Sequence, residues 1–260
     1  MGNMREAIRG YFLPRRHSIL LGAIVLALAV RPLLGDRGSG PVVFSIALLV
    51  LMLVALYSIQ TEELVGEQKT LLAEKRRRSI VGWTLAVLAA GDRFAAIFMP
   101  THSLYLAGSI CWLLFFVFIT WNELRAVLRQ KEVTRETISL SISIYLLLGF
   151  TWALLFIVIN NVQSQAFSFG GSQISNSSPA SEQQDFPILI YFSLTTLATI
   201  GYGDITPLSL QARYAAVAEG ITGQFYLAIL VARLVGIQMT QSASRDAERR
   251  TLDADTKRVS

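Results

Sequence analysis

The sequence has few of the side chains that enzymes use for covalent or metal chemistry. Its 260 residues include one cysteine and two histidines, and only 16% of them are charged. Cys111 lies inside an apolar block and has no second cysteine to pair with, so an intrachain disulfide is excluded. The sequence contains no Ser/His/Asp set, metal-ligand cluster or phosphate-binding glycine loop, and His17 and His102 are interpreted as interfacial residues. We therefore do not expect an enzyme.

The sequence instead contains long apolar runs. Hydrophobic residues make up 53% of the chain, and its charged fraction is well below the roughly 25% that is usual in soluble domains. At a rise of about 1.5 Å per residue, some 20 helical residues cross the hydrocarbon core of a membrane. The apolar blocks therefore predict six membrane spans, at residues 18–34, 41–59, 79–99, 103–121, 138–159 and 211–237.

Two of these blocks contain charged residues. The first carries Arg31 and Pro32 near its end instead of a small-residue cleavage site, so it is interpreted as a retained span and not as a signal peptide. Asp92 and Arg93 interrupt the third block after thirteen uncharged residues. A charge at the bilayer centre costs about 2.5–3.5 kcal/mol. This pair is therefore expected either near the outer interface or facing other helices that neutralise it.

The basic residues indicate how the spans are oriented, because Lys and Arg favour the cytoplasmic side. With the N-terminus inside, the inner segments hold 18 Lys and Arg, whereas the outer segments hold only Arg37 and Arg213. Six spans then place both termini in the cytoplasm, and we expect an integral protein of a bacterial inner membrane. Topology accounts for the net charge of +5, so nucleic acid is not an expected partner.

The segments between the spans divide the chain into regions. They predict a cytoplasmic N-terminus at 1–17, a four-helix transmembrane domain at 18–121, a cytoplasmic connector at 122–137, a pore domain at 138–240 and a cytoplasmic tail at 241–260. The connector is expected to be a helix on the membrane surface, and the tail either a solvated helix or disordered. After a polar loop at 160–185, Asp185 is expected to cap a short helix at 186–198, with Pro187 in its first turn.

The most informative segment follows that short helix. Residues 195–204 read TTLATIGYGD, with Gly201 and Gly203 in alternate positions. Glycine tolerates left-handed backbone angles that residues with a Cβ avoid, and alternating such residues with ordinary ones can turn successive carbonyl oxygens to one side. Four copies around an axis would stack rings of carbonyl oxygens, to which the Thr199 hydroxyls add a ring at the inner end. Such a stack can replace the water shell of a monovalent cation, whereas the simpler interpretation is a glycine-rich turn.

This segment resembles the selectivity filter of potassium channels, Thr-x-x-Thr-x-Gly-Tyr-Gly-Asp, with Ile200 at the variable position. In layout the chain is similar to a prokaryotic-type potassium channel of the six-transmembrane, one-pore-loop class in the voltage-gated superfamily. The resemblance implies an all-α membrane protein with six transmembrane helices, a re-entrant pore helix and a homotetramer in membrane lipid. It implies a filter of Thr199, Ile200, Gly201, Tyr202 and Gly203, with K⁺ bound at the first four. K⁺ is then the permeant ion, and no cofactor is expected.

The resemblance also implies roles for residues beside the filter. Tyr191 and Phe192 stand where similar channels place an aromatic cuff that braces the filter, although they also fit a lipid-facing or core position. Thr195 and Thr196 precede the filter and are expected to support it. Asp204 at the outer mouth either attracts cations or anchors the filter by hydrogen bonding.

Two residues of the sixth predicted span, Gly223 and Glu219, are candidates for a functional role. Gly223 lies twenty residues past Gly203, at the spacing of the glycine about which the inner helix of similar channels bends. Close helix packing is the competing interpretation, since glycine is common in membrane helices. Glu219 lies one turn earlier and must be protonated, hydrogen-bonded or facing water. It either braces the pore helix near Thr195 or Thr196 or is a protonated side chain satisfied locally.

The chain departs from the voltage-gated pattern in its fourth predicted span. A voltage sensor needs several arginines there, because each charge that crosses the field contributes only about 2.3 kcal/mol per 100 mV. Residues 103–121 contain neither Arg nor Lys. We therefore expect potassium conduction with weak or no voltage dependence. The alternatives are a weakly selective cation channel and a non-conducting regulatory subunit that retains the pore fold.

Overall fold

The computed structural model describes residues 15–34, 40–65, 72–98, 101–130, 132–163, 165–170, 172–173 and 179–259. Most of the predicted N-terminal segment lies outside these ranges, as do residues 164, 171 and 174–178 of the polar loop. The side chains of Asp92, Arg93 and His102 also lie outside the described residues, so the predictions made for them stay predictions.

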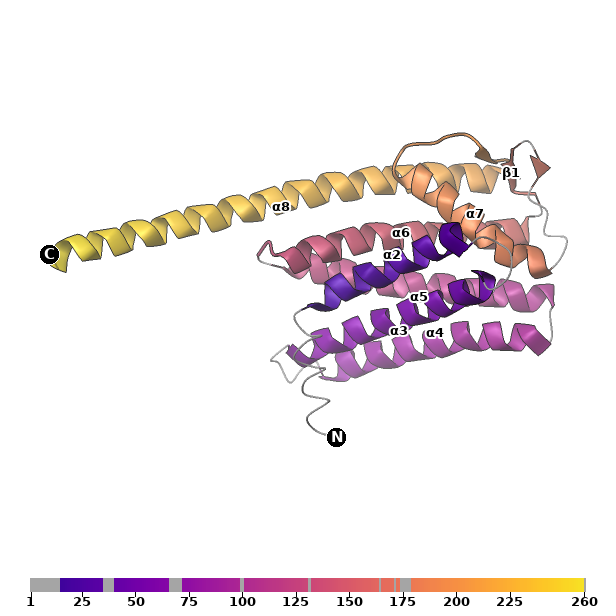
Figure 1. Cartoon of the computed structure of the whole chain (residues 1–260), viewed down its shortest axis with the longest axis horizontal. Coiled ribbons are helices and arrows are strands. Elements are labelled where there is room, and N and C mark those ends of the chain that lie inside the picture. The colour runs from indigo at the N-terminus through magenta and orange to yellow at the C-terminus, as the bar shows by residue number, and fades with distance from the viewer. Residues whose placement is uncertain are drawn as a thin grey trace.

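Helices account for most of the described chain. Five of them, α2 (Arg16–Leu34), α3 (Gly40–Val65), α4 (Leu72–Phe98), α5 (His102–Arg129) and α6 (Arg135–Val162), pack side by side in a bundle (Figure 1). α7 (Pro179–Leu197) lies obliquely between α6 and α8. α8 (Leu210–Val259) runs along α6 and continues far beyond the bundle to the C-terminus.

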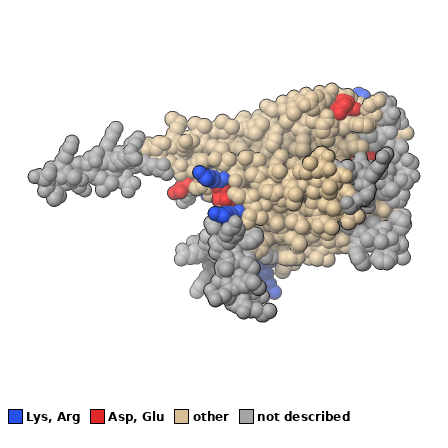
Figure 2. Space-filling model, in the orientation of Figure 1, with Lys and Arg blue, Asp and Glu red and all other residues tan. Residues whose placement is uncertain are grey.

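Several of these helices have the length and composition of membrane spans. Among the described residues, Arg16–Leu34, Ser103–Arg129, Arg135–Val162 and Leu210–Ala243 are long and apolar enough to cross a membrane, and Val42–Ser58 and Asp185–Leu197 are shorter apolar helices. On the face shown in Figure 2, the described charged side chains gather toward the two ends of the bundle, and the surface between them is uncharged. This distribution matches a protein whose helices stand across a bilayer.

One aromatic core joins the bundle to α7. The rings of Phe116 on α5 and Phe150 on α6 stack at a centroid distance of 5.4 Å. Phe150 in turn lies 6.1 Å from Phe186 on α7, whose ring is 5.6 Å from that of Phe44 on α3. Because these rings are buried, the early helices and the predicted pore region share one hydrophobic core.

The connector predicted at 122–137 is not a separate surface helix. Residues 122–129 continue α5, and α6 begins at Arg135 after Thr134, whose side chain caps the helix by accepting a 3.2 Å hydrogen bond from the Thr137 N–H. Ala126 and Val127 are buried against Leu140 and Ile144 of α6. Their apolar contact keeps the end of α5 in the bundle despite its charged neighbours.

The short helix also begins earlier than predicted. α7 starts at Pro179 rather than at residue 186, so Asp185 and Pro187 lie inside the helix and Asp185 is not its cap. Proline fits the first position of a helix, where its missing N–H would have no partner. The end of the helix at Leu197 agrees with the prediction to one residue.

Two further differences concern the outer loop and the tail. Three short strands form an antiparallel sheet in the order β2-β1-β3: β1 (Phe167–Phe169), β2 (Ser172–Gln173) and β3 (Ile205–Pro207). The all-α prediction did not include this sheet, which is stabilised by burial of Phe167 and Ile205. The tail is helical, because α8 continues without a break to Val259.

Candidate functional site

The glycine-containing segment runs between the end of α7 and the start of β3. Its backbone takes positive φ angles at alternate residues, 57° at Thr199, 54° at Gly201 and 81° at Gly203. The sequence predicted this conformation at the two glycines only, and Thr199 extends the alternation by one step toward α7. Ile200 and Tyr202 between them are 54% and 70% exposed in the single chain. This is the alternation that turns successive carbonyl oxygens to one side.

The end of the segment next to α7 is held by backbone hydrogen bonds to that helix. The N–H of Thr199 donates to the carbonyl of Thr196 at 2.9 Å, and the N–H of Ile200 donates to the carbonyl of Thr195 at 2.8 Å. The Tyr145 hydroxyl on α6 donates to the Leu197 carbonyl at 3.2 Å. Thr195 and Thr196 thus contact the segment through their carbonyl groups.

The other end is held by the small sheet. Phe169 on β1 pairs with Ile205 on β3, and the Gly170 N–H donates to the Asp204 carbonyl at 3.0 Å. These contacts clamp the backbone directly after Gly203. This sheet contact was not predicted, although the alternation Phe167-Ser168-Phe169 is a short strand signal.

The two aromatic residues predicted to brace the filter have different surroundings. The Tyr191 ring stacks on the Tyr202 ring at 6.4 Å with an interplanar angle of 4°, and its hydroxyl interacts with Asp204. Phe192 is buried and packs edge-on against Phe156 and Phe167 at 5.1 and 5.4 Å. Tyr191 is therefore placed to contact the segment directly, whereas Phe192 belongs to the core behind it. Of the two roles considered for Asp204, its contact with Tyr191 favours anchoring by hydrogen bonding over attraction of cations.

Glu219 on α8 is fully buried and contacts α7 through Ser193, not through Thr195 or Thr196. The Ser193 Oγ lies 2.5 Å from Glu219 Oε1 and 2.8 Å from the carbonyl oxygen of Gly149 on α6. A serine hydroxyl has one hydrogen and can fully satisfy only one of these acceptors. Both contacts are hydrogen bonds when Glu219 is protonated. The Glu219 O–H then donates a hydrogen bond to Ser193 Oγ, and the Ser193 hydroxyl donates to the Gly149 carbonyl. The side chain then joins α8, α7 and α6 without a buried charge.

This arrangement predicts that two substitutions of Glu219 differ in their effect on the free energy of unfolding. Glu219→Ala removes the hydrogen bond and leaves a gap, so we expect the free energy of unfolding of the purified protein to fall by about 1–3 kcal/mol. Glu219→Gln keeps a neutral donor of nearly the same shape and should change it by less than about 0.5 kcal/mol. Thermal and denaturant unfolding of the two variants measures the difference. Equal losses in both would contradict a neutral donor at this position.

Gly223 lies where α8 crosses the end of α7. A Cβ at this position would lie 2.4 Å from the Leu197 carbonyl oxygen and 3.0 Å from Leu197 Cδ1. α8 passes through Gly223 as one continuous helix. The structure therefore shows the close packing that was one of the two interpretations, and the hinge stays a prediction.

Comparison with known proteins finds a match for the part of the chain that contains residues 199–203. Residues 141–239 match a family model described as an ion channel. This match supports an ion channel. The chain is also similar to Protein LctB of Bacillus caldotenax, with 32% identity over 94 residues, which are 35% of this chain and 62% of the relative. The alignment thus spans less than two thirds of that relative's length. No solved structure matches the chain.

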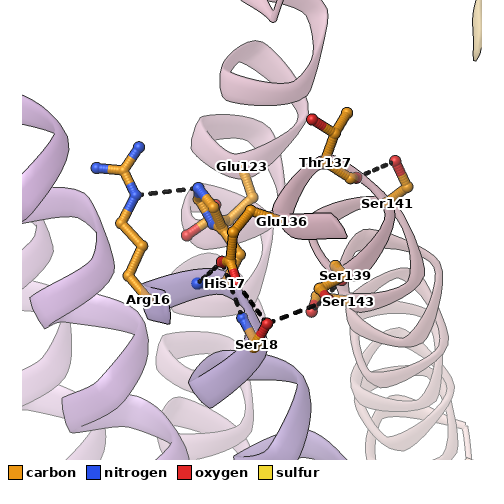
Figure 3. A network of polar contacts seen from close by, with 9 residues as sticks. All are labelled: Arg16, His17, Ser18, Glu123, Glu136, Thr137, Ser139, Ser141 and Ser143. Carbon is orange, nitrogen blue, oxygen red and sulfur yellow. Dashed lines mark hydrogen bonds and ion pairs between the residues drawn. The ribbon is translucent and has the colours of Figure 1, made fainter. Parts of the chain in front are cut away.

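A polar network joins the start of α2 to the start of α6 (Figure 3). The Glu136 carboxylate in the first turn of α6 accepts hydrogen bonds from the backbone N–H groups of His17 at 3.1 Å and Ser18 at 3.3 Å, and from the Ser18 hydroxyl at 2.5 Å. Acceptors at a helix N-terminus satisfy N–H groups that have no partner within the helix. His17 is buried, with Nδ1 3.7 Å from Glu123 of α5, and its predicted position at the membrane interface stays a prediction.

A second contact joins the end of α5 to α8. The Arg233 guanidinium donates to three carbonyl groups, those of Val127, of Leu128 at 2.7 Å and of Gln130 at 2.8 Å. These carbonyls lie at the C-terminal end of α5, where the helix leaves acceptors unpaired and a cation is favoured. The start of α2 is thus joined to α6 by Glu136, and the end of α5 is joined to α8 by Arg233.

Proposed function

We propose that the chain is the subunit of a potassium-selective channel that conducts passively through a fourfold pore. The observation that carries this proposal is the alternating backbone at Thr199, Gly201 and Gly203, set between a pore helix and a strand clamp. K⁺ would bind at the carbonyl oxygens of Thr199, Ile200, Gly201 and Tyr202 and at the Thr199 hydroxyl. The match of residues 141–239 to an ion-channel family supports the same assignment.

A homotetramer follows from the same proposal, because one chain supplies one quarter of each carbonyl ring. The filter and one side of α8 are exposed in the single chain. Tyr214, Val217, Phe225 and Ile229 of α8 are large apolar side chains with 60–71% exposure. In the tetramer these side chains would face neighbouring copies or membrane lipid, as apolar surface of this extent requires.

The proposed topology has six spans with both termini on the cytoplasmic side of a bacterial inner membrane. α2 to α5 would form the four-helix domain, α6 the outer pore helix and α8 the inner one. Arg125 lies past the predicted fourth span, with its guanidinium 4.9 Å from the centre of the Trp121 ring. Because residues 103–121 carry no Arg or Lys, little charge can cross the field and conduction should be nearly independent of voltage.

Purified channel in vesicles tests the proposal. We expect potassium flux that barium blocks and sodium flux close to that of empty vesicles. In planar bilayers the open probability should change less than about twofold over 100 mV, because residues 103–121 supply no basic side chain to cross the field. A single elementary charge that crossed the whole field would contribute about 2.3 kcal/mol and give a much steeper response. Equal sodium and potassium flux would indicate a weakly selective cation channel, and no flux in correctly assembled protein would indicate a non-conducting subunit.

A further inference from the structure

Gln224 exposes a side-chain amide in the apolar part of α8. It lies within the stretch Leu210–Ala243, which is long and apolar enough to cross a membrane. Among the described residues Gln224 has no hydrogen-bond partner, whereas the nearby Thr222 hydroxyl donates to the Ala218 carbonyl at 2.7 Å. An amide without a partner is costly in hydrocarbon, so we expect Gln224 to face water or another polar surface.

Two glycines of α8 show which way Gln224 faces. A Cβ at Gly223 would lie 2.4 Å from the Leu197 carbonyl oxygen. A Cβ at Gly220 would lie 3.9 Å from the Thr196 carbonyl oxygen, so both glycines face the C-terminal end of α7. At about 100° per residue, Gln224 lies about 100° from Gly223 and about 40° from Gly220, on the far side of Gly220 from Gly223. Gln224 is therefore directed past the end of α7.

The other flank of α8 is occupied by α6. The Tyr226 hydroxyl donates to the Ser141 carbonyl at 2.7 Å, and Tyr226 lies about 160° from Gln224 round the helix. Gln224 thus lies on the side of α8 away from α6 and next to the end of α7, from which the segment 199–203 continues. Along the helix it is only about 1.5 Å past Gly223, so it lies at the level where this segment begins.

Apolar side chains continue this face toward the C-terminus of α8. Val231 and Val235 come seven and eleven residues after Gln224, within about 20° of it round the helix. They are 58% and 51% exposed in the single chain. Four copies around one axis would place the amides between the segment 199–203 and rings of valine. A cation that leaves a path of carbonyl oxygens regains its water shell at this level.

We propose that four Gln224 amides form a ring that binds a hydrated cation directly inside the segment 199–203, and that Mg²⁺ entering from the C-terminal side of α8 occupies this ring and blocks potassium. The amide oxygen accepts hydrogen bonds from the water shell of the ion, so the ring needs no charge. Mg²⁺ gives up its water reluctantly, so it fits such a ring and is excluded from a carbonyl path that takes bare ions. The inference rests on the proposed function, because the ring needs four copies around one axis.

Cysteine labelling tests the placement of Gln224 without relying on conduction. The single native cysteine is removed by Cys111→Ser, and Gln224→Cys or Phe225→Cys is introduced into the full-length chain. Phe225 is the matched control, because it is 64% exposed at nearly the same depth but lies about 100° further round α8. In vesicles, a small charged thiol reagent should label Gln224→Cys at least about tenfold faster than Phe225→Cys, since only position 224 faces water. Equal rates, including no labelling of either variant, would overturn the placement.

Block by Mg²⁺ tests the binding ring. Mg²⁺ is added to planar bilayers on the side of the α8 C-terminus, and the concentration that halves the potassium current is measured. Gln224→Glu adds four negative charges to the ring and should lower this concentration at least about tenfold. Gln224→Leu removes the hydrogen-bonding groups and should raise it at least about fivefold. Equal values in the three proteins, or the reverse order, would contradict binding at Gln224.

Gln238→Glu separates a local site from general attraction of cations. Gln238 is an exposed glutamine of the same helix, about 21 Å further toward its C-terminus. Screening over about 8–10 Å means that the same charge placed there should change the half-blocking concentration less than about twofold. Equal shifts in Gln224→Glu and Gln238→Glu would contradict the ring.

The selectivity of the wild-type protein distinguishes failure of the ring from failure of the proposed function. Potassium selectivity with no effect of the Gln224 substitutions on Mg²⁺ block would overturn the ring and leave the potassium proposal intact. Equal sodium and potassium currents that Mg²⁺ blocks in the expected order would overturn the potassium proposal and support the ring.

Discussion

Replacement of Gly201 by alanine is expected to abolish potassium flux while the tetramer still folds. Gly201 has a φ of 54°, and no neighbouring atom lies within 4 Å of where a Cβ would stand. The substitution therefore causes backbone strain and no clash, at a cost of about 1–2 kcal/mol for a left-handed residue. Four copies would relax that strain at the same level of the pore and misalign a whole ring of carbonyl oxygens. Potassium flux from vesicles, with tetramers verified by size-exclusion chromatography, measures the effect.

Gly170 provides the matched control for this experiment. It has the same φ of 54° and the same open space around a Cβ, but it lies in the turn after β1 and outside the segment 199–203. Its contact with that region is the hydrogen bond from its backbone N–H to the Asp204 carbonyl, which alanine can also make. Gly170→Ala should cost a similar amount of stability and retain most of the flux. Normal conduction by Gly201→Ala channels, or equal loss of flux in both variants, would contradict the proposed role of the segment 199–203.

Gly223→Ala is expected to destabilise the tetramer by about 1–3 kcal/mol and to remove most of the potassium flux. The new Cβ would lie 2.4 Å from the Leu197 carbonyl oxygen, a backbone atom that cannot rotate away. Overpacking of this kind forces a shift of the backbone. Leu197 lies two residues before Thr199, so a shift at the end of α7 moves the inner end of the proposed filter. The unfolding midpoint and the tetramer fraction measure the stability, and vesicle flux measures the function.

Gly220, three residues earlier on α8, separates packing from a general effect of alanine. A Cβ there would lie 3.9 Å from the Thr196 carbonyl oxygen, which is ordinary contact, so Gly220→Ala should behave like the wild type. If Gly223→Ala instead keeps normal stability and changes only the time that the channel stays open, Gly223 acts as a hinge and the packing explanation is wrong.

The left-handed backbone at Gly201 and Gly203, in the proposed filter, was predictable from the sequence because its signal is local. Gly201 and Gly203 are the residue type that the positive φ angles require, and Asp204 and Thr199 complete the string around them. The left-handed conformation of Thr199 was not predicted, because residues with a Cβ rarely adopt positive φ angles and the residue type gives no signal for it. Hydrogen bonds from Thr199 and Ile200 to the end of α7 hold it there.

The supporting contacts were predicted only in part. Glu219 stood out as a carboxylate in an apolar helix, but its partner is Ser193 and not one of the two threonines named in advance. The choice depends on how α8 rotates against α7, which a single helical sequence does not specify. The sheet of β1 and β3 joins residues from either side of α7, and its strands are too short for a reliable periodic signal.

The sequence by itself determined that the chain is rich in membrane-length apolar helices and that residues 199–203 can form a carbonyl-lined path. Both properties depend on the hydrophobicity and backbone freedom of neighbouring residues. The tertiary structure decided which distant groups meet. Glu136 caps α2 across 119 residues of sequence, and Arg233 reaches the end of α5 across more than a hundred. Such contacts follow from the packing of whole helices, because only their mutual angles and rotations bring a given donor and acceptor within hydrogen-bond distance.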